Sequence, residues 1–377
     1  MISPNGEHPQ SVPGSRVQVV FGPGNLARIG EIAKSQGGSR VLLVTDPGIK
    51  DAGHVERAVR ALYKAGLPVK VFDEVGENPT TIHVGKGVIA SKAFEPDLII
   101  GLGGGSSMDC AKGINFLLTN GGRMQDYWGT GKAERPLLPF VAVPTTAGTG
   151  SDAQSYALIT DPDTHQKMAC GDAKALPRVA LLDPELTATQ PPKVAAATGI
   201  DAVAHAVESA GSTKRNDVSR RLSIEAWRLL ESGFEHALRE PNDLDARQRM
   251  LLGAHLAGAA IENSMLGAAH ALANPLTGLC GIVHGVAVGL MLPHDIRSTS
   301  AGDGRPYADL DADPEKLATR IESLLQAGQL PRTLRDVDVP ESKLSELAKM
   351  AATQWTATFN PRKVGEAELL AIYRMAL

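Results

Sequence analysis

The residue types and spacings best suited to catalysis lie in residues 199–285, which open with GIDAVAHAVE and close with AAHALANPLTGLCGIVHG. Asp201, His205, His270 and His284 in this stretch are all able to bind a divalent metal ion. Asp201 and His205 lie in an alanine-rich segment without proline that predicts a helix, and at their i, i+4 spacing the Cβ atoms are about 5–6 Å apart on one face. Metal–ligand bonds of about 2.0–2.2 Å let both side chains reach one ion. One carboxylate with three imidazoles suits Fe²⁺ or Zn²⁺ rather than Mg²⁺ or Ca²⁺, which prefer oxygen ligands.

A purely structural interpretation of these residues stays open at this point. A single Asp-x-x-x-His pair on a helix is more often a capping carboxylate and a packed histidine than a metal site. The two distal histidines, however, lie among Ala, Gly and Val residues. Such small residues let a backbone and an ion approach closely, which favours the metal site.

The elements that must position these residues fall into two kinds. In the first half of the chain, apolar runs alternate with helical segments, and RVLLVTD at 40–46 is apolar enough for a strand buried on both faces of a parallel sheet. This alternation predicts a doubly wound α/β domain over residues 16–188, preceded by a polar, flexible tail at 1–15. The expected strands are 17–22, 40–46, 68–75, a strand that runs from 96 into a glycine turn, and PFVAV at 139–143; the expected helices are 25–36, 53–65 and 81–93.

The second half, residues 189–377, is predicted to be a helical domain, and it contains all four candidate metal ligands. Proline and turn-forming residues cluster at DPELTATQPP, 183–192, which places the domain boundary there. The expected helices are 192–211, 217–238, 243–262, 285–292, 314–326, 341–354 and 365–376.

Two glycine- and hydroxyl-rich segments in the first half are candidates for holding a nucleotide. GLGGGSSMDCAK, 101–112, follows an expected strand and opens a helix, whose free N–H groups suit a phosphate, although Ser106 interrupts the G-x-G-x-x-G pattern. PTTAGTGSD, 144–152, offers three threonine hydroxyls after another strand. Asp46 ends a buried strand, where it suits an adenosine ribose and would repel a 2′-phosphate, favouring NAD over NADP. Taken singly, these features are equally consistent with a tight turn, a polar loop and a helix cap.

Composition excludes several other classes of function. The formal net charge of −4 and an aromatic content of 4% argue against a nucleic-acid partner. The longest apolar patch, near residues 283–292, is too short and too interrupted to span a membrane. Three widely separated cysteines form no disulfide framework, so a cytoplasmic protein is expected.

In combination, the motifs GGGSSMDCAK, PTTAGTGSD and GIDAVAHAVE and the H-x13-H pair resemble the iron-containing (group III) alcohol dehydrogenase family. The similarity runs from FGPGNL at 21–26 to NPRKVGEAELLAIYRMAL at the end of the chain. It implies an α/β dinucleotide-binding domain followed by an all-α domain, the architecture of the dehydroquinate synthase-like superfamily, with the active site in the cleft between them. It also implies a small alcohol or aldehyde substrate and a homodimer or larger homo-oligomer.

The resemblance further implies a set of site residues. Fe²⁺, with Zn²⁺ as the alternative, would be held by Asp201, His205, His270 and His284. The residues implied to contact NAD(P) are Asp46, Asn78, Gly103, Gly104, Gly105, Ser106, Asp109, Thr145, Thr146, Thr149 and Lys167.

Two positions depart from the family pattern. The family commonly has a further histidine four residues after the third ligand, where this chain has Asn274. Asparagine forms hydrogen bonds but does not titrate near neutral pH, which puts a proton relay through this position, and the usual substrate assignment, in doubt. The family's PTTAGTGSE ends here in the shorter Asp152.

Two other enzyme classes fit the same architecture. A maleylacetate reductase-like or hydroxyacid dehydrogenase would share the redox chemistry but differ in the substrate pocket. A dehydroquinate synthase-like lyase would combine a related fold with NAD and Zn²⁺ but give no net change in NADH. The GIDAVAHAVE motif and the H-x13-H pair favour the alcohol dehydrogenase.

Overall fold

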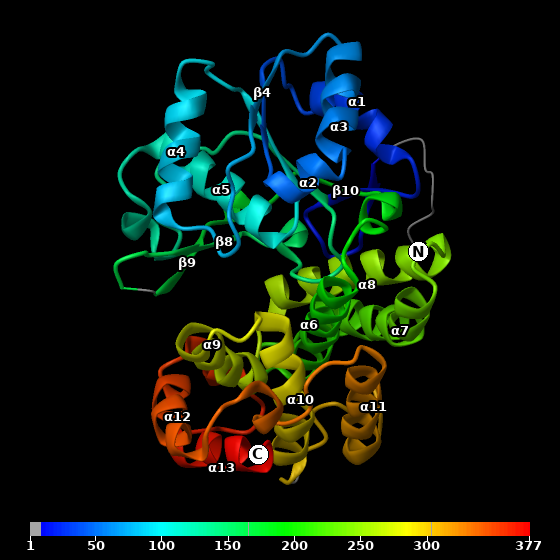
Figure 1. Cartoon of the computed structure of the whole chain (residues 1–377), viewed down its shortest axis with the longest axis vertical. Helices are drawn as coiled ribbons and strands as arrows, with labels where there is room; N and C mark the ends of the chain where they lie inside the picture. Colours follow the sequence, from blue (N-terminus) through cyan, green and yellow to red (C-terminus); the bar gives the residue numbers. More distant parts are fainter. Residues whose placement is uncertain (1–8, 165, 303) are drawn as a thin grey trace. The chain divides into compact units, whose positions relative to one another are not determined.

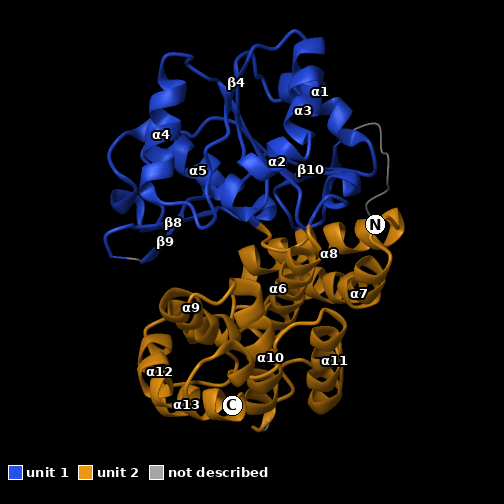
Figure 2. Cartoon of the chain, viewed as in Figure 1, with its two compact units in different colours: residues 1–146, 151–190 blue, residues 147–150, 191–377 orange. Residues whose placement is uncertain are grey.

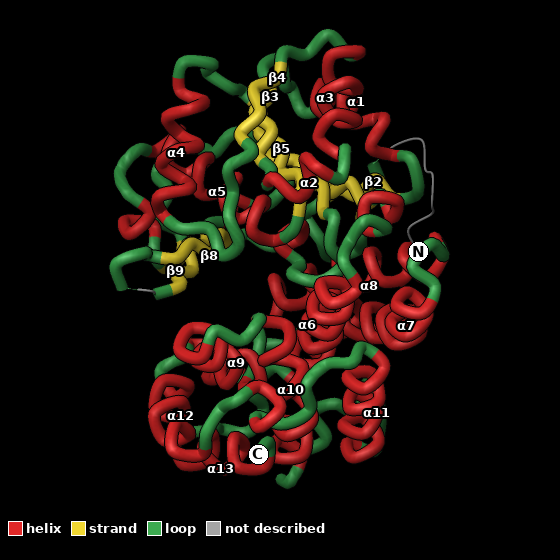
Figure 3. The backbone as a smooth tube through the Cα atoms, viewed as in Figure 1, coloured by secondary structure: helices red, strands yellow, loops and turns green. Residues whose placement is uncertain are grey.

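The computed structural model describes residues 9–164, 166–302 and 304–377, and these form two compact units (Figure 2). The first unit comprises Met1–Thr146 and Ser151–Gln190, and the second comprises Ala147–Gly150 and Pro191–Leu377. Among the described residues, strands occur only in the first unit, whereas the second consists of helices and loops (Figure 3). This is the predicted fold class, an α/β domain followed by an all-helical one.

The first unit is built on a seven-stranded sheet with the order β1-β2-β10-β7-β5-β3-β4. All neighbouring strands are parallel except β1 and β2. Every residue of β3, β5, β7 and β10 is buried, as expected for parallel strands covered on both faces. The strands are β1 Gln10–Ser11, β2 Gln18–Phe21, β3 Val41–Val44, β4 Val69–Phe72, β5 Leu98–Gly103, β7 Phe140–Pro144 and β10 Val179–Leu182.

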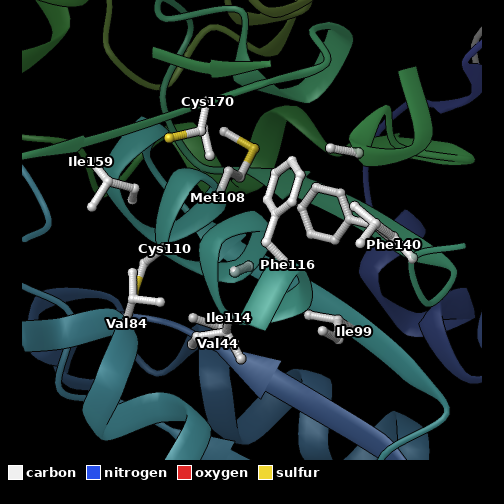
Figure 4. Packing of buried hydrophobic residues seen from close by; sticks show 14 of the residues in the cluster. Val44, Val84, Ile99, Met108, Cys110, Ile114, Phe116, Phe140, Ile159 and Cys170 are labelled. Atoms are coloured by element: carbon white, nitrogen blue, oxygen red, sulfur yellow. The ribbon is translucent and has the colours of Figure 1, made fainter. Parts of the chain in front are cut away.

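Helices cover both faces of this sheet and create two separate cores (Figure 1). Successive residues of β3 alternate between the cores: Leu43 packs with Ile29 and Leu62 on one face, whereas Val44 on the other belongs to the cluster in Figure 4. In that cluster Ile114 of α5 contributes to the core beside the sheet. The helices of this unit are α1 Ile29–Ser35, α2 Pro47–Asp51, α3 His54–Lys64, α4 Thr81–Lys92 and α5 Gly105–Asn120.

Three features of the first unit differ from the expectation. A second sheet of three strands, in the order β6-β9-β8, was not predicted because its strands are short and half-exposed; they are β6 Gly129–Thr130, β8 Tyr156–Thr160 and β9 Lys167–Gly171. The apolar strand β10 was also missed, since the cluster of turn residues begins directly after it. The predicted flexible tail at 1–15 lies outside the described residues over 1–8, but Gln10–Ser11 form β1, which pairs with β2.

The helices of the second unit begin largely where capping residues predict. Asn216 caps α7, Asp243 caps α8 and Asp313 caps α11, each accepting hydrogen bonds from first-turn N–H groups. Five predicted helices agree with the structure to within about two residues at each end. The helices are α6 Pro192–Gly211, α7 Asp217–Arg239, α8 Leu244–Ser264, α9 Ala268–Cys280, α10 His284–Ser300, α11 Pro314–Ala327, α12 Leu344–Ala352 and α13 Glu366–Met375.

Two helices in this unit were predicted wrongly, and both contain proline. Helix α9 was not expected at all, and it continues through Pro275. Helix α10 was expected to end at residue 292 but continues through Pro293 to Ser300. An internal proline costs about 3 kcal/mol or more, which the dense burial of both helices offsets.

None of the helices in the described part of the chain is both long and apolar enough to cross a membrane. Helix α6 shows why, because its alanine-rich sequence is interrupted by Asp201, His205 and Glu208. These three side chains are buried inside the unit, where a polar group requires partners.

Candidate active site

The candidate metal ligands come together from three helices of the second unit. Asp201 and His205 lie one turn apart on α6, His270 lies in the first turn of α9, and His284 is the first residue of α10. Nε2 of His270 is 3.5 Å from Oδ1 of Asp201, and Nε2 of His284 is 4.0 Å from the same oxygen. One ligand atom from each of these three side chains lies within 4.8 Å of the others.

His205, the fourth predicted ligand, lies beside this group of three and is not part of the set whose ligand atoms all lie within 4.8 Å of one another. Its Nε2 atom is 3.7 Å from Oδ1 of Asp201. Its ring stacks on that of His270 with centroids 5.0 Å apart, and the ring of His284 meets His270 edge-on at 5.4 Å. All four side chains therefore converge on one small volume.

A glycine brings the His284 end of α10 close to α6. A Cβ atom at Gly285 would lie 2.0 Å from the carbonyl oxygen of Ala197 and 3.2 Å from Cβ of Asp201. No larger residue fits there without moving one helix away from the other. The small residue beside the histidine thus sets the distance between two of the candidate ligands.

The cluster holds one ionised carboxylate among imidazoles. Burial raises the pKa of Asp201, but the surrounding histidines outweigh burial and hold this pKa well below its usual range. Burial lowers the pKa of His205. Burial also lowers the pKa of His270, yet the carboxylates of Glu208 and Asp201 outweigh it and raise the pKa to about 10. The negative charge of Asp201 is therefore matched by a proton on His270 or by a bound cation.

The residues present fit a divalent transition metal. Within the described residues, Oδ1 of Asp201 and Nε2 of His270 are buried without a hydrogen-bond partner, although they lie close to each other. Buried polar atoms in native proteins nearly always have a partner. A carboxylate oxygen and imidazole nitrogens are the donors that Fe²⁺ and Zn²⁺ accept, so a cation of this kind would satisfy both atoms.

In the first unit, most of the residues predicted to bind nucleotide line one edge of the large sheet. Strands β3, β5 and β7 are adjacent and parallel, so their carboxyl ends meet at this edge. Open parallel sheets bind ligands at such an edge. The predicted residues that follow or end these strands are Asp46, Gly103, Gly104, Gly105, Ser106, Thr145 and Thr146.

Asp46 has two partners inside the unit. Its side chain caps α2 by accepting a hydrogen bond from the N–H of Ile49 at 3.1 Å, and it accepts another from Oγ of Ser107 at 2.8 Å. Gly103, with φ of +150°, allows this approach, because a Cβ atom there would lie 2.4 Å from Oγ of Ser107. The carboxylate is thus held at the end of β3 and remains partly exposed.

Asn78 and Lys167 join the same glycine-rich turn. The N–H of Asn78 donates to Oγ of Ser106 at 3.3 Å, and Nζ of Lys167 donates to Oδ1 of Asn78 at 3.4 Å. Asn78 has a positive φ of 49°, which asparagine tolerates better than most residues. Three predicted cofactor-binding residues from distant parts of the sequence therefore lie side by side.

Asp109 faces the protein interior. It is buried, and Oγ of Ser151 donates to its Oδ1 at 2.6 Å. Lys112, which the sequence analysis did not single out, lies beside it and donates to the carbonyl oxygens of Ser151, Gln154 and Tyr156. Burial raises the pKa of Asp109. Asp109 and Lys112 therefore connect α5 to the segment that follows the PTTAGTG loop.

The threonines of that loop are divided between the units. Oγ1 of Thr145 and Oγ1 of Thr146 are buried and have no hydrogen-bond partner among the residues the structure describes. A Cβ atom at Gly104 would lie 3.4 Å from Cγ2 of Thr146, so the two predicted segments touch. Thr149 belongs to Ala147–Gly150, which groups with the second unit.

Comparison with known proteins identifies the family. Residues 16–184 match the sequence-family model described as iron-containing alcohol dehydrogenase. Residues 195–377 match the model described as the C-terminal part of the Fe-containing alcohol dehydrogenase family. The chain belongs to the iron-containing alcohol dehydrogenase family. Its activity is accordingly that of an oxidoreductase of the alcohol dehydrogenase type.

Individual relatives of this alcohol dehydrogenase match almost end to end. The 1,3-propanediol dehydrogenase of Klebsiella pneumoniae is 37% identical over 94% of this chain and 96% of its own length. A crystal structure of 1,3-propanediol oxidoreductase superposes with a TM-score of 0.90 and 35% identity, covering 95% of this chain and 97% of that one. The sulfoacetaldehyde reductase of Bifidobacterium kashiwanohense, solved in complex with NAD⁺, has a TM-score of 0.88 and 27% identity over 98% of this chain and 99% of its own.

Asn274 is one of the two positions that depart from the family pattern. It lies one turn after His270 on α9. Its Nδ2 donates to Oε1 of Gln354 at 3.0 Å, and its side chain is half-buried. Residues four apart share a helix face, so the amide lies on the same side of α9 as His270. Two neutral amides thus occupy a place where a titratable group was expected.

Three buried residues around the cluster were missed by the sequence analysis: Glu208, Asp295 and Asn360. Glu208 was recognisable in principle, since it lies on the Asp201–His205 face of α6, seven residues after Asp201. Asp295 lies on α10 together with His284, so helix periodicity offered a signal there too. Asn360 carried no such signal, because its segment is far away in the sequence. Burial, and secondly the charge of Glu208, raises the pKa of Asp295 to about 7.

Proposed function

We propose that this alcohol dehydrogenase is an iron-dependent, NAD-preferring enzyme that interconverts a short alcohol or diol with the corresponding aldehyde or ketone. The convergence of Asp201, His270 and His284, with His205 beside them, carries this proposal. Oδ1 of Asp201 and Nε2 of His270, which face each other there, are buried without a hydrogen-bond partner among the described residues. A divalent metal bound there supplies a Lewis acid for the oxygen of the substrate. The same ligand set suits Zn²⁺, and family membership favours Fe²⁺.

The side chains of the cluster have distinct tasks in this proposal. Asp201 contributes the only carboxylate among the four, and its lowered pKa keeps it ionised over the working pH range. Burial keeps His205 neutral by lowering its pKa, so a ring nitrogen remains free of a proton. His284 is the most accessible member, with 29% of its side chain exposed, and we place the substrate on its side of the cluster.

The nucleotide is proposed to bind at the edge formed by β3, β5 and β7. Oxidised NAD accepts the hydride when the alcohol is oxidised, and reduced NAD donates it when the aldehyde or ketone is reduced. The hydroxyls of Thr145 and Thr146 have no hydrogen-bond partner in the described part of the chain. Together with the glycine turn at Gly103–Gly105, they support binding of the phosphates and ribose of NAD there. Asp46 supports NAD over NADP, because its carboxylate would repel a 2′-phosphate.

The hydroxyl proton of an alcohol substrate must leave during oxidation. Asn274 and Gln354 form hydrogen bonds but do not titrate near neutral pH, so they can orient the substrate without accepting this proton. We therefore propose that the proton passes to solvent past the exposed side of His284. The protein contributes chiefly by fixing the distance and orientation of the reacting atoms.

A metal-reconstituted substrate screen tests this function. The protein would be freed of metal with chelator, reloaded separately with Fe²⁺ and Zn²⁺, and assayed with short alcohols, 1,3-propanediol and aldehydes using NAD and NADP. We expect NADH formation that depends on added metal and is faster with NAD. Turnover that persists after chelation, or that leaves NADH unchanged while a sugar phosphate is consumed, would contradict the proposal.

A further inference from the structure

Helix α9, which carries His270, begins without a capping side chain of its own. Its N-cap residue is Gly267, which offers no side chain to accept hydrogen bonds from the first turn. The first N–H groups of a helix have no partner within the helix, and buried groups of this kind must find one elsewhere. The start of α9 is buried, so its partners have to come from other helices.

Glu208 of α6 supplies those partners. Its Oε1 accepts hydrogen bonds from the N–H groups of Gly267 at 3.1 Å and His270 at 3.2 Å. Its Oε2 accepts a hydrogen bond from Nδ1 of the His270 ring. Glu208 is only 2% exposed, and its carboxylate accepts hydrogen bonds from two backbone groups and from the ring of one candidate ligand.

Glycine at position 267 makes this contact possible. A Cβ atom there would lie 3.1 Å from Oε1 of Glu208 and 2.9 Å from Oδ1 of Asn360. Oδ1 of Asn360 accepts from the N–H of Ala268 at 3.2 Å, so a second side chain caps the same turn. Within the described residues, no hydrogen bond joins Asn360 to the His270 ring. Glu208 and Asn360 therefore both cap α9, but Glu208 is the one that also binds the His270 ring.

The hydrogen bond at Nδ1 decides which ring nitrogen faces the metal cluster. With a proton held on Nδ1 by the carboxylate, Nε2 is the nitrogen left to act as ligand, and it points to Asp201 at 3.5 Å. Carboxylates that accept from the outer nitrogen of a ligating histidine fix its orientation and raise its basicity. A negative group at a helix N-terminus is also favourable by itself.

We propose that Glu208 is a positioning residue that holds His270 in the Nδ1–H form and holds the start of α9 against α6, so that Nε2 is aimed at the metal. This inference rests on the proposed metal-binding function. Asp201 and His205, the two candidate ligands on α6, belong to the same helix as Glu208, so one helix places two ligands and orients a third.

The variant Glu208→Gln separates tautomer control from capping. Glutamine has the same shape, and its carbonyl oxygen can still accept from the backbone N–H groups. Its NH₂ group would then face Nδ1, and because it can only donate, it favours a proton on Nε2 and blocks the ligand nitrogen. The matched control is Asn360→Ala, which removes the other cap and leaves the Glu208–His270 contact in place.

The experiment is a titration of metal-free wild-type and variant proteins with Co²⁺, following the visible absorption bands and the dissociation constant, with the melting temperature measured beside them. We expect Glu208→Gln to weaken Co²⁺ binding by about 10- to 100-fold and to change the visible bands. Asn360→Ala should lower the melting temperature but leave the spectrum and the dissociation constant of wild type. Glu208→Asp, which keeps the charge on a shorter side chain, should restore part of the lost affinity.

Three outcomes would overturn the inference. The first is wild-type Co²⁺ affinity and spectrum in Glu208→Gln. The second is equal weakening in Glu208→Gln and Asn360→Ala, which would show a general loss of structure. The third applies if Glu208→Gln does not fold: wild-type Co²⁺ affinity and bands in Glu208→Ala, which has no side-chain acceptor for Nδ1, would then decide against the role. Wild-type protein that binds no Co²⁺ would instead overturn the proposed metal function, and the inference with it.

Discussion

The metal cluster of the helical unit and the nucleotide edge of the α/β unit are built in opposite ways. In the cluster, side chains from three helices converge, and atoms of Asp201 and His270 are left without a hydrogen-bond partner among the described residues. Along the edge of the sheet, several charged and amide side chains already have partners within the unit, as Asp46 does with Ser107 and Asn78 with Lys167, and the hydroxyls of Thr145 and Thr146 are the ones left without a partner among the described residues. The first arrangement is incomplete without a cation, whereas the second is a self-supporting surface. Single substitutions should therefore abolish function in the first and tune it in the second.

The largest effect is expected from Asp201→Ala, which removes the oxygen ligand. Metal content and turnover should be lost together, with kcat/KM falling by at least about 10³-fold, because Lewis-acid assistance contributes several kcal/mol. Metal analysis after dialysis and the NADH-linked assay measure both quantities. If Asp201→Ala kept full activity after chelation, the cluster would not need a cation, and the contrast between the two regions would be wrong.

The second effect is a dependence of metal affinity on pH. Because the pKa of His270 in the metal-free protein is raised to about 10, its ring carries a proton at neutral pH that a metal must displace. The proton competes below this pKa, so affinity should rise with pH, by up to about tenfold per pH unit for one displaced proton. Co²⁺ titrations at several pH values in weak buffer, with an indicator for released protons, test this. An affinity that is constant with pH would show that no proton is displaced.

A third test concerns the free-energy cost of ionising the buried side chain of Asp295. Asp295 is buried, and its Oδ2 atom has no hydrogen-bond partner among the described residues, so the neutral acid is favoured. Its pKa is raised from 3.8 to about 7, so the folded state binds the proton more tightly than the unfolded state, and the free energy of unfolding falls as pH rises through this interval. Above about pH 7 the full penalty applies, as much as about 4 kcal/mol.

Asp295→Asn should therefore stabilise the metal-free protein at about pH 8 and have little effect at about pH 4. Urea unfolding at the two pH values measures the difference. The asparagine can still accept from Thr299, which donates to Oδ1 of Asp295 at 2.8 Å in the wild type. A change of stability that is the same at both pH values would contradict the assignment.

The smallest effect is expected at the sheet edge. Asp46→Ser should relax the preference for NAD over NADP by about tenfold, the effect of about 1.4 kcal/mol, because it removes a charge that repels the 2′-phosphate. It should also cost about 1 kcal/mol of stability or less, since serine can still cap α2. Ratios of kcat/KM for the two cofactors measure the first quantity. Unchanged discrimination would exclude Asp46 from cofactor choice.

The difference between the two regions also explains which parts were predictable. Strands β3 and β5 and helix α6 follow local rules of apolar runs, alanine content and caps, and the sequence predicted them closely. Helix α9 contains Pro275 and forms because Leu272 and Leu276 are fully buried, which is information that a local pattern does not hold. The partnership of Asp46 with Ser107 likewise required the two strand ends to be neighbours.

The sequence by itself determined the ligand types, the pairing of Asp201 with His205 on one helix face, and the family, because helix periodicity and motif order are local properties of the chain. Only the tertiary structure decided that His270 and His284 reach Asp201, and that Glu208 caps α9 and binds the His270 ring. These contacts join segments about 60 residues or more apart, and they depend on how closely helices pack. The need for glycine at 267 and 285 can be understood only from this packing. Gly267 leaves room for side chains of other segments and Gly285 for the backbone of α6, and no local sequence pattern specifies these neighbours.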